Sequence, residues 1–410
     1  MNHSIAKSGL SAVAIAAAAV FASGSAFAAI GAPIVTTTNS PTAGANTEEV
    51  YSIGPDGHLR YTSLSVFQGW TNYDISNYLL TLPSPSALPT VGSPLAYAHS
   101  TSGPDELFWL SADGHVHQTT SVPGQLYTNT DLTAATGSPI AAAGSPMTAL
   151  ALPGAKLRVY YQSTFGRIQE IAFDGAGHWT TTDLTAATGN TMLGTVGTPM
   201  ASTVIGGANP RVYFFNTINH VAEMAASSGW HTTDLNVATG TNPPAQGSAL
   251  TSVTFSGTSP HVFYFDVNNH VHELASSSSW HDTDLTNSTG TPVAMRGTGM
   301  TSFVLNNGAN PKVYYTSYDG HIRQLTWSGS WSKIDLSGDL CAAPVAPNSL
   351  LSSYSSTNIN NAVFYMSTDG HLRELLNSNQ DWSGIDINGS GTSTTCAGDS
   401  GGVGGGIIPK

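Results

Sequence analysis

The stretch HVFYFDVNNHVHELASSSSWHDTDLTNSTG, residues His261–Gly290, decides the fold, because the rest of the chain repeats it. Two apolar runs, Val262–Asp266 and His270–Leu274, flank a short turn. A segment from Trp280 to Leu285 follows, before a stretch rich in Thr, Gly and Pro. Short runs of aromatic and β-branched residues between turn signals are typical of strands. The unit therefore predicts a small antiparallel sheet that must stack beside neighbouring copies in order to fold.

Two independent markers each count seven copies of this unit. The first is the turn, whose third residue falls at 57, 114, 166, 219, 269, 320 and 370. The second is an aromatic residue with an Asp four positions later: Trp70/Asp74, Tyr127/Asp131, Trp179/Asp183, Trp230/Asp234, Trp280/Asp284, Trp331/Asp335 and Trp382/Asp386. The turns recur every 50 to 57 residues, a period that suits a four-stranded propeller blade. The segment before each hairpin, such as Leu250–Ser256 or Met300–Leu305, supplies the fourth strand. We expect an all-β, seven-bladed β-propeller of four-stranded antiparallel blades over residues 29–388.

The turn residues predict the register of each hairpin. The third turn position is Gly in five copies and Asn in the other two, and both residues tolerate positive φ. A type I turn followed by one left-handed residue is a standard hairpin connection. In that register Tyr160 lies opposite Glu170, and Tyr213 lies opposite Glu223. The arginines two positions before these tyrosines, Arg158 and Arg211, then share a face with the glutamates.

The two ends of the chain differ in composition from the repeats. Residues 1–28 contain Lys7, an apolar run over 10–21 and the small residues before Ala29, which is the pattern of a cleaved secretory signal peptide. A membrane anchor is the alternative, but the apolar run is short for a span, and no other run approaches that length. We therefore expect no membrane insertion and a secreted protein, extracellular or in transit through a periplasm. Residues 389–410 form a Gly/Ser-rich tail without propensity for regular structure.

Charge and cysteine content restrict the partners and the compartment. Charged residues make up 9% of the chain, and the formal net charge is −13. Without a Lys/Arg-rich patch, nucleic acid and anionic membrane surfaces are poor partners. The two cysteines, Cys341 and Cys396, follow the sixth and seventh copies. In an oxidising compartment they predict a disulfide that ties the tail to the last blade; two free thiols are the alternative.

Motifs that suggest catalysis have simpler explanations. GDSGG at residues 398–402 matches the nucleophile motif of chymotrypsin-like proteases, but it lies in the tail and lacks the rest of the triad's fold. The His pairs at 115/117 and 270/272 could bind a metal, although a structural role is the simpler interpretation. The repeated Asp suits a turn hydrogen bond, and the repeated Trp suits packing between blades, with a ligand platform as the alternative. We expect no enzyme, no cofactor and no metal.

The Arg and Glu positions are different because they vary from copy to copy. They read Glu49/Tyr61, Glu106/Gln118, Arg158/Glu170, Arg211/Glu223, His261/Glu273, Lys312/Gln324 and Ala362/Glu374. A guanidinium donates to sugar oxygens, a carboxylate accepts from hydroxyls, and an aromatic ring covers the C–H face. A surface salt bridge is the alternative interpretation.

The hairpins RVYYQSTFGRIQE (Arg158–Glu170) and RVYFFNTINHVAE (Arg211–Glu223) resemble the repeat of fungal fucose-specific lectins, in which the Arg and Glu hold fucose. The blade count and the phrase WTTTDLTAATG are more similar to PLL-type bacterial seven-bladed lectins, which bind fucose or O-methylated sugars between adjacent blades. The resemblance covers essentially the whole mature chain. In this family an aromatic residue follows the Glu by three positions; here it is Phe173 or Trp327, but Ala226, Ser276 or Asn377 in other copies.

Together, the residues and the resemblance predict a multivalent carbohydrate-binding protein. Its partners would be fucosylated or O-methylated glycans on cell surfaces or polysaccharides, and an oligomer is compatible with this expectation. The predicted sugar-binding residues are Arg158, Glu170, Phe173, Arg211, Glu223, His261 and Glu273. A structural or protein-binding propeller without sugar binding is the alternative. A glycosidase is disfavoured, because the sequence shows no isolated pair of carboxylates of the kind these enzymes use.

Overall fold

The computed structural model describes residues 34–39, 47–65, 69–82, 87–99, 104–122, 125–189, 191–305, 310–355, 361–378 and 381–389. The predicted signal peptide and all but the first residue of the predicted tail lie outside these ranges. Cys396 lies outside them as well, so its disulfide with Cys341 stays a prediction.

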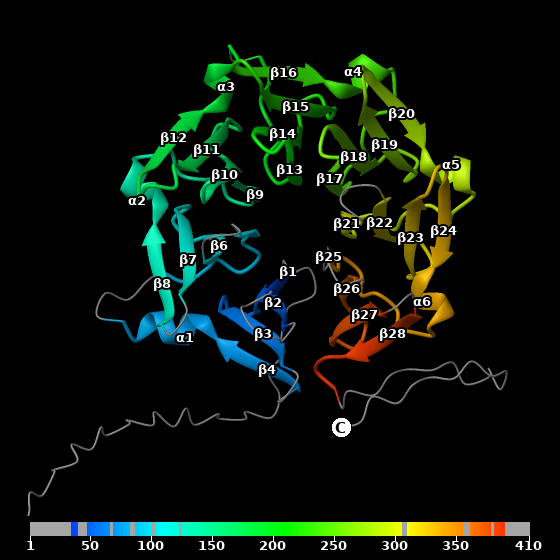
Figure 1. Ribbon diagram of the computed structural model, residues 1–410, viewed down its shortest axis with the longest axis horizontal. Coiled ribbons are helices and arrows are strands. Elements are labelled where there is room, and N and C mark those ends of the chain that lie inside the picture. Colours follow the sequence, from blue (N-terminus) through cyan, green and yellow to red (C-terminus); the bar gives the residue numbers. More distant parts are fainter. Residues whose placement is uncertain are drawn as a thin grey trace, which may run out of the picture.

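Seven sheets stand in a ring around a central axis (Figure 1). Each sheet has four antiparallel strands in chain order, so the predicted seven-bladed β-propeller is confirmed. The first strands of successive blades contact one another around the axis, and β25 contacts β1 to close the ring. Turns that precede these inner strands line a cavity of about 490 Å³, to which Met147, Met200 and Met300 contribute.

The strands of each blade follow one another directly along the chain. Blade 1 holds β1 (Ile34–Asn39), β2 (Thr47–Ile53), β3 (Leu59–Ser65) and β4 (Gly69–Asp74). Blade 2 holds β5 (Leu95–His99), β6 (Asp105–Leu110), β7 (Val116–Val122) and β8 (Gln125–Asp131). Blade 3 holds β9 (Met147–Leu152), β10 (Lys156–Gln162), β11 (Ile168–Phe173) and β12 (Trp179–Asp183). Blade 4 holds β13 (Met200–Ile205), β14 (Asn209–Phe215), β15 (Val221–Ala226) and β16 (Trp230–Asp234).

The last three blades have the same plan. Blade 5 holds β17 (Leu250–Phe255), β18 (Ser259–Phe265), β19 (Val271–Ser276) and β20 (Trp280–Asp284). Blade 6 holds β21 (Met300–Leu305), β22 (Asn310–Thr316), β23 (Ile322–Trp327) and β24 (Trp331–Asp335). Blade 7 holds β25 (Ser352–Ser355), β26 (Asn361–Met366), β27 (Leu372–Ser378) and β28 (Asp381–Asp386).

The central hairpin of each blade has the predicted register. The third turn residue has a positive φ in all seven copies: Gly57, Gly114, Gly166, Asn219, Asn269, Gly320 and Gly370. Tyr160 pairs with Glu170, and Tyr213 pairs with Glu223. Paired residues point to the same face of a sheet, and so do residues two apart on one strand. Arg158 and Arg211 therefore lie on the same face as the two glutamates, as the turn chemistry predicted.

Apolar side chains between neighbouring blades form the core. Seven buried clusters each draw residues from two adjacent blades. The aromatic residue that begins the outer strand packs edge-on against the middle of the preceding blade, as Trp230 does against Tyr160 and Trp280 does against Tyr213. The predicted role of the repeated Trp in packing between blades is confirmed.

Six short helices in the described part of the chain were not predicted. They are α1 (Ile75–Leu80), α2 (Leu132–Thr136), α3 (Leu184–Ala187), α4 (Leu235–Thr239), α5 (Leu285–Thr289) and α6 (Leu336–Asp339). In each, the repeated Asp is the N-cap and accepts a hydrogen bond from a backbone N–H of the first turn. None of the described helices has the length and apolar character needed to cross a membrane.

The same Asp also holds the residue that closes the hairpin turn. In six copies this residue is His, and its Nδ1 lies 2.7–3.0 Å from the Asp carboxylate. In copy 3 it is Arg167, whose Nε donates to Asp183. The predicted structural roles of the repeated Asp and His are therefore confirmed: together they connect the hairpin turn to the end of the outer strand.

Candidate functional site

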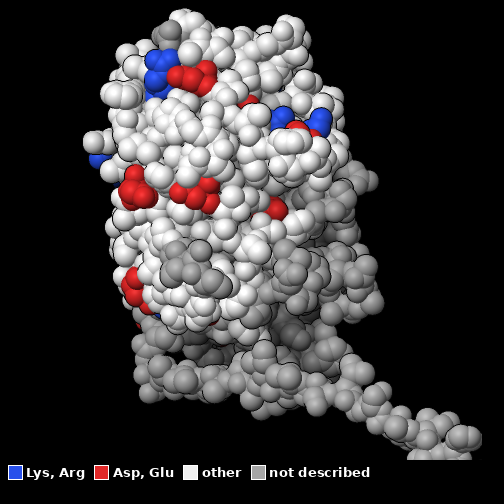
Figure 2. All heavy atoms as spheres, turned by 90° about the vertical axis from the view of Figure 1, so that its left-hand side faces the viewer, with Lys and Arg blue, Asp and Glu red and all other residues white. Residues whose placement is uncertain are grey.

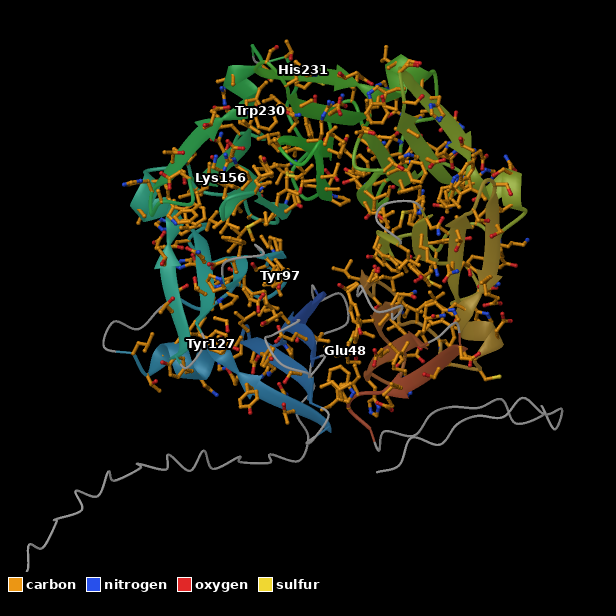
Figure 3. All side chains as sticks on the ribbon, in the orientation of Figure 1. Glu48, Tyr97, Tyr127, Lys156, Trp230 and His231 are labelled. Carbon is orange, nitrogen blue, oxygen red and sulfur yellow. The ribbon has the colours of Figure 1, made fainter. Side chains whose placement is uncertain are left out.

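The variable Arg and Glu positions lie where one blade faces the next. We call the interface of blades 3 and 4 junction 3/4, and name the other interfaces in the same way. The tyrosine that pairs with the Glu belongs to the apolar cluster of this junction, together with the Trp of the following blade. Figure 3 shows Trp230 on the side of blade 4 that faces blade 3. A cation, a carboxylate and an aromatic ring from two blades therefore meet at one junction.

Junction 4/5 contains a directly bonded ion pair. Arg211 Nη1 donates to Glu223 Oε1 at 2.8 Å, and the Tyr213 hydroxyl donates to the same oxygen at 3.3 Å. The Glu223 side chain is 2% exposed and that of Arg211 is 20% exposed, so the carboxylate is buried while the guanidinium reaches solvent. Arg211 Nε has no hydrogen-bond partner among the described residues. The half-buried Trp280 packs edge-on against Tyr213, with ring centroids 6.3 Å apart.

Junction 3/4 has the same residues in a looser arrangement. Arg158 Nε lies 3.5 Å from Glu170 Oε2, which is longer than a hydrogen bond. The guanidinium instead donates from Nη1 to the backbone oxygens of Leu157 and Phe173. Burial raises the pKa of Glu170, and the positive charge of Arg158 opposes this shift. Among the described residues, Glu170 Oε2 and the Tyr160 hydroxyl are buried without a hydrogen-bond partner, so the junction can accept and donate further hydrogen bonds.

Junction 5/6 replaces the arginine by histidine. His261 Nδ1 lies 2.6 Å from Glu273 Oε1, and Trp331 Nε1 of blade 6 donates to Glu273 Oε2 at 3.0 Å. Trp327 lies next to Trp331, with ring centroids 5.9 Å apart. The carboxylate is thus held from both blades, and two indole rings stand beside it.

The structure separates Phe173 from the Arg158/Glu170 pair with which it was grouped. Glu170 and Phe173 are three positions apart on β11 and therefore point to opposite faces. The Phe173 ring packs on Trp179 and belongs to the cluster of junction 2/3. The grouping was wrong, because the parity that places Arg158 beside Glu170 excludes Phe173. By the same parity, Trp327 of blade 6 faces junction 5/6 and accompanies Glu273.

Comparisons with known proteins give the family. The sequence profile of the fungal fucose-specific lectins matches residues 107–397, more than half of the chain. The chain belongs to this lectin family. A comparison with curated protein sequences found no match.

Solved structures of other lectins share the fold. The BP39L lectin of Burkholderia pseudomallei superimposes with a TM-score of 0.60 at 16% identity, covering 89% of this chain and 99% of its own. The Aleuria aurantia lectin in complex with alpha-methyl-L-fucoside has a TM-score of 0.54 at 18% identity, covering 90% and 97%. AofleA of Arthrobotrys oligospora has a TM-score of 0.51 at 17% identity, covering 74% and 86%. The Aleuria lectin is described as six-bladed, whereas this lectin has seven blades.

The other four junctions of the lectin lack the combination of an Arg or His with a Glu at these two positions. Junction 6/7 has Lys312 with Gln324, and the ammonium lies over the Trp382 ring. Junction 7/1 has Ala362 with Glu374, which is fully buried. Burial and the nearby carboxylate of Glu48 raise the pKa of Glu374. Figure 3 shows Glu48 on the side of blade 1 that faces blade 7.

Sequence reasoning assigned the repeated tryptophans to packing and missed their place beside the variable residues. Trp230, Trp280 and Trp331 each lie across a junction from the Glu of the preceding blade, and Trp331 bonds to it directly. The recurrence of a Trp 57 to 60 residues after each Glu, in the next copy, was present in the sequence. This spacing can be interpreted only when it is known which face of a blade packs against which neighbour. The packing of the blades around the ring determines this.

Junction 2/3 yields a prediction about pH. Glu106 accepts hydrogen bonds from Gln118 and Thr120, but burial raises its pKa to about 7. The folded lectin therefore keeps a proton on Glu106 that the unfolded chain releases near the ordinary pKa of a Glu. The contribution of Glu106 to the free energy of unfolding is complete below about pH 4.3 and is lost as the pH rises through about 7. We expect the free energy of unfolding of the Glu106→Gln variant, relative to that of the wild type, to increase by roughly 2–4 kcal/mol between pH 4 and pH 8. Urea unfolding of both proteins at several pH values measures this; a constant difference would contradict it.

Proposed function

We propose that this protein is a secreted, multivalent lectin that binds fucose, or a related sugar such as an O-methylated one, at junctions 3/4, 4/5 and 5/6. The observation that carries the proposal is the recurrence, at three successive junctions, of an arginine or histidine, a buried glutamate and a tryptophan from the following blade. Membership in the fungal fucose-specific lectin family supports the choice of sugar.

The chemistry of the three junctions suits a neutral sugar. The guanidinium or imidazole donates to ring and hydroxyl oxygens, the carboxylate accepts from hydroxyls, and the indole covers a C–H face. The unpartnered Glu170 Oε2, Tyr160 hydroxyl and Arg211 Nε can be satisfied by hydroxyl groups. Figure 2 shows one face of the molecule with few charged side chains scattered among uncharged ones. This face therefore offers few charged groups that could bind a charged polymer.

Several weak sites on one ring favour binding to a surface. Simultaneous engagement of a second site can raise the overall avidity by about 10²–10⁴ without any new contact. The three junctions are consecutive around the ring, so they open along one arc of the propeller. A secreted protein, as the N-terminal segment predicts, would meet such glycans on cell surfaces or on secreted polysaccharides.

Calorimetric titration with alpha-methyl-L-fucoside, together with a glycan array, tests the proposal. We expect about three equivalents of sugar to bind per chain. We also expect the protein to be retained on a multivalent fucosylated surface more strongly than its affinity for the free monosaccharide implies. The triple variant Glu170→Gln, Glu223→Gln, Glu273→Gln keeps the shape of all three side chains and is expected to lose binding while it remains folded. Absence of binding to every sugar by the intact protein would favour the alternative, a propeller that presents loops to other proteins.

A further inference from the structure

Blade 5 contains a cluster of metal-ligating groups at the turn end of its central hairpin. A carboxylate oxygen of Asp266 and one ring nitrogen each from His270 and His272 lie within 4.8 Å of one another. Asp266 directly follows β18, His270 closes the turn and His272 is the second residue of β19. The side chains of Asp266 and His272 are almost completely buried, and 23% of the His270 side chain is exposed. The cluster is therefore built into the blade and open to solvent on one side.

His272 is held by a hydrogen bond through one of its two ring nitrogens. Its Nδ1 lies 2.8 Å from Asp282 Oδ1, so Nδ1 carries the proton and donates it to that carboxylate. Its Nε2 is buried and has no hydrogen-bond partner among the described residues. This nitrogen points instead at two carboxylate oxygens, Asp266 Oδ2 at 3.5 Å and Asp284 Oδ2 at 3.9 Å. Both oxygens belong to carboxylates, so a cation bound between them and Nε2 would be stabilised.

The equivalent positions of blade 6 carry permanent cations. There, Arg323 takes the place of His272 and pairs with Asp319 and Asp335, while Lys333 takes the place of Asp282. Those two cations and two anions sum to zero. In blade 5 Asp284 corresponds to Asp335, but Asn268 takes the place of Asp319, and Asp266 takes the place of the neutral Ser317. Blade 5 therefore has three carboxylates, those of Asp266, Asp282 and Asp284, beside two histidines, and no Lys or Arg at these positions.

We propose that Asp266, His270 and His272 bind a divalent transition-metal ion, for which Zn²⁺ is the best match. Imidazole nitrogens and a carboxylate oxygen are zinc ligands, and three protein ligands leave a fourth position for water. Neighbouring ligand atoms of a tetrahedral zinc site lie about 3.3 Å apart, close to the separation between His272 and Asp266. Asp282 orients His272 as carboxylates orient zinc-binding histidines. Ca²⁺, which prefers six or more oxygen ligands, is a poor match.

The other blades of the chain supply substitutions that fit the fold. Gln169 occupies the position of His272 in copy 3, and Ser111 occupies that of Asp266 in copy 2. His272→Gln and Asp266→Ser therefore introduce residues that other blades already accommodate. Copy 2 is also a matched control, because it has His115, His117 and the capping Asp but lacks both extra carboxylates.

Titration of the metal-free, untagged chain with ZnCl₂ in a calorimeter tests the proposal. We expect one saturable Zn²⁺ per chain, and we expect H272Q and D266S each to weaken it by at least about 100-fold. Asp282→Asn should weaken it about 10–100-fold, the usual effect of removing a group that orients a ligand, and His117→Gln should change nothing. Zn²⁺, but not Ca²⁺, should raise the melting temperature of the wild type and leave that of H272Q unchanged. The proposal is overturned if the wild type binds no Zn²⁺, or if H272Q and D266S bind it as tightly as the wild type.

Discussion

Replacing Arg211 with methionine is expected to destabilise the lectin by about 3–5 kcal/mol, the usual cost of removing one partner of a buried ion pair. The change leaves the Glu223 carboxylate with 2% exposure and no cation, while only the weak hydrogen bond from Tyr213 remains. Urea unfolding at neutral pH measures the loss. The double variant Arg211→Met, Glu223→Gln should recover most of it, because no charge is then left in the interior.

Junction 6/7 provides the matched control for this prediction. Lys312 occupies the position of Arg211, and its partner position holds the neutral Gln324. Burial lowers the pKa of Lys312, so its removal leaves no carboxylate unpaired and relieves a desolvated cation. We expect Lys312→Met to cost no more than about 1 kcal/mol. Equal losses in R211M and K312M would show that the buried Glu223 charge does not determine the stability of junction 4/5.

Replacing Trp280 with alanine is expected to remove one sugar-binding site and to cost about 2–4 kcal/mol of stability. The half-buried indole packs against Tyr213 and the apolar cluster of junction 4/5, and removing a large aromatic residue from a core leaves a cavity. It also removes the indole that blade 5 packs against Tyr213, whose hydroxyl donates to Glu223. We therefore expect the stoichiometry of alpha-methyl-L-fucoside to fall by one per chain.

Trp382→Ala separates the two effects of the tryptophan. Trp382 packs against Tyr314 at junction 6/7 with nearly the same geometry, 6.3 Å between ring centroids, but no Arg–Glu pair accompanies it. This variant should lose a similar amount of stability and keep the wild-type number of sugar sites. If it instead lost a site as Trp280→Ala does, the tryptophans would affect binding through the fold and not through contact with the sugar.

Turn chemistry and the alternation of side chains along a strand were sufficient to predict the structure of an individual blade. The turn residues Asn219 and Gly166 adopt the left-handed conformation that their chemistry favours, and this conformation sets the register that pairs Tyr213 with Glu223. A register is a local property, since the turn and the alternation of side chains are both determined within a dozen residues. The shared face of Arg211 and Glu223 could therefore be predicted before any contact between blades was known.

The short helices escaped prediction for an identifiable reason. A helix such as Leu132–Thr136 is too short to show a helical period in its apolar residues. The signals that mark it are its two ends: Asp131 caps the first turn, and Gly137 follows the last one in the left-handed conformation. Read as a pair of caps, the Asp-Leu-Thr-Ala-Ala-Thr-Gly segment predicts the helix that the strand pattern hides.

By itself, the sequence determined the seven copies, the four strands of each blade and the face on which each variable side chain lies, because these features depend on spacing within one unit. Only the tertiary structure decided which residues of different blades meet: Trp280 with Tyr213 beside the Arg211/Glu223 pair, Trp331 with Glu273, and Trp179 with Phe108. The physical reason is that each junction is formed by two sheets whose relative position is set by packing around the whole ring. The sequence of one repeat shows only the residues that one blade contributes to a site, and the neighbouring blade contributes the others.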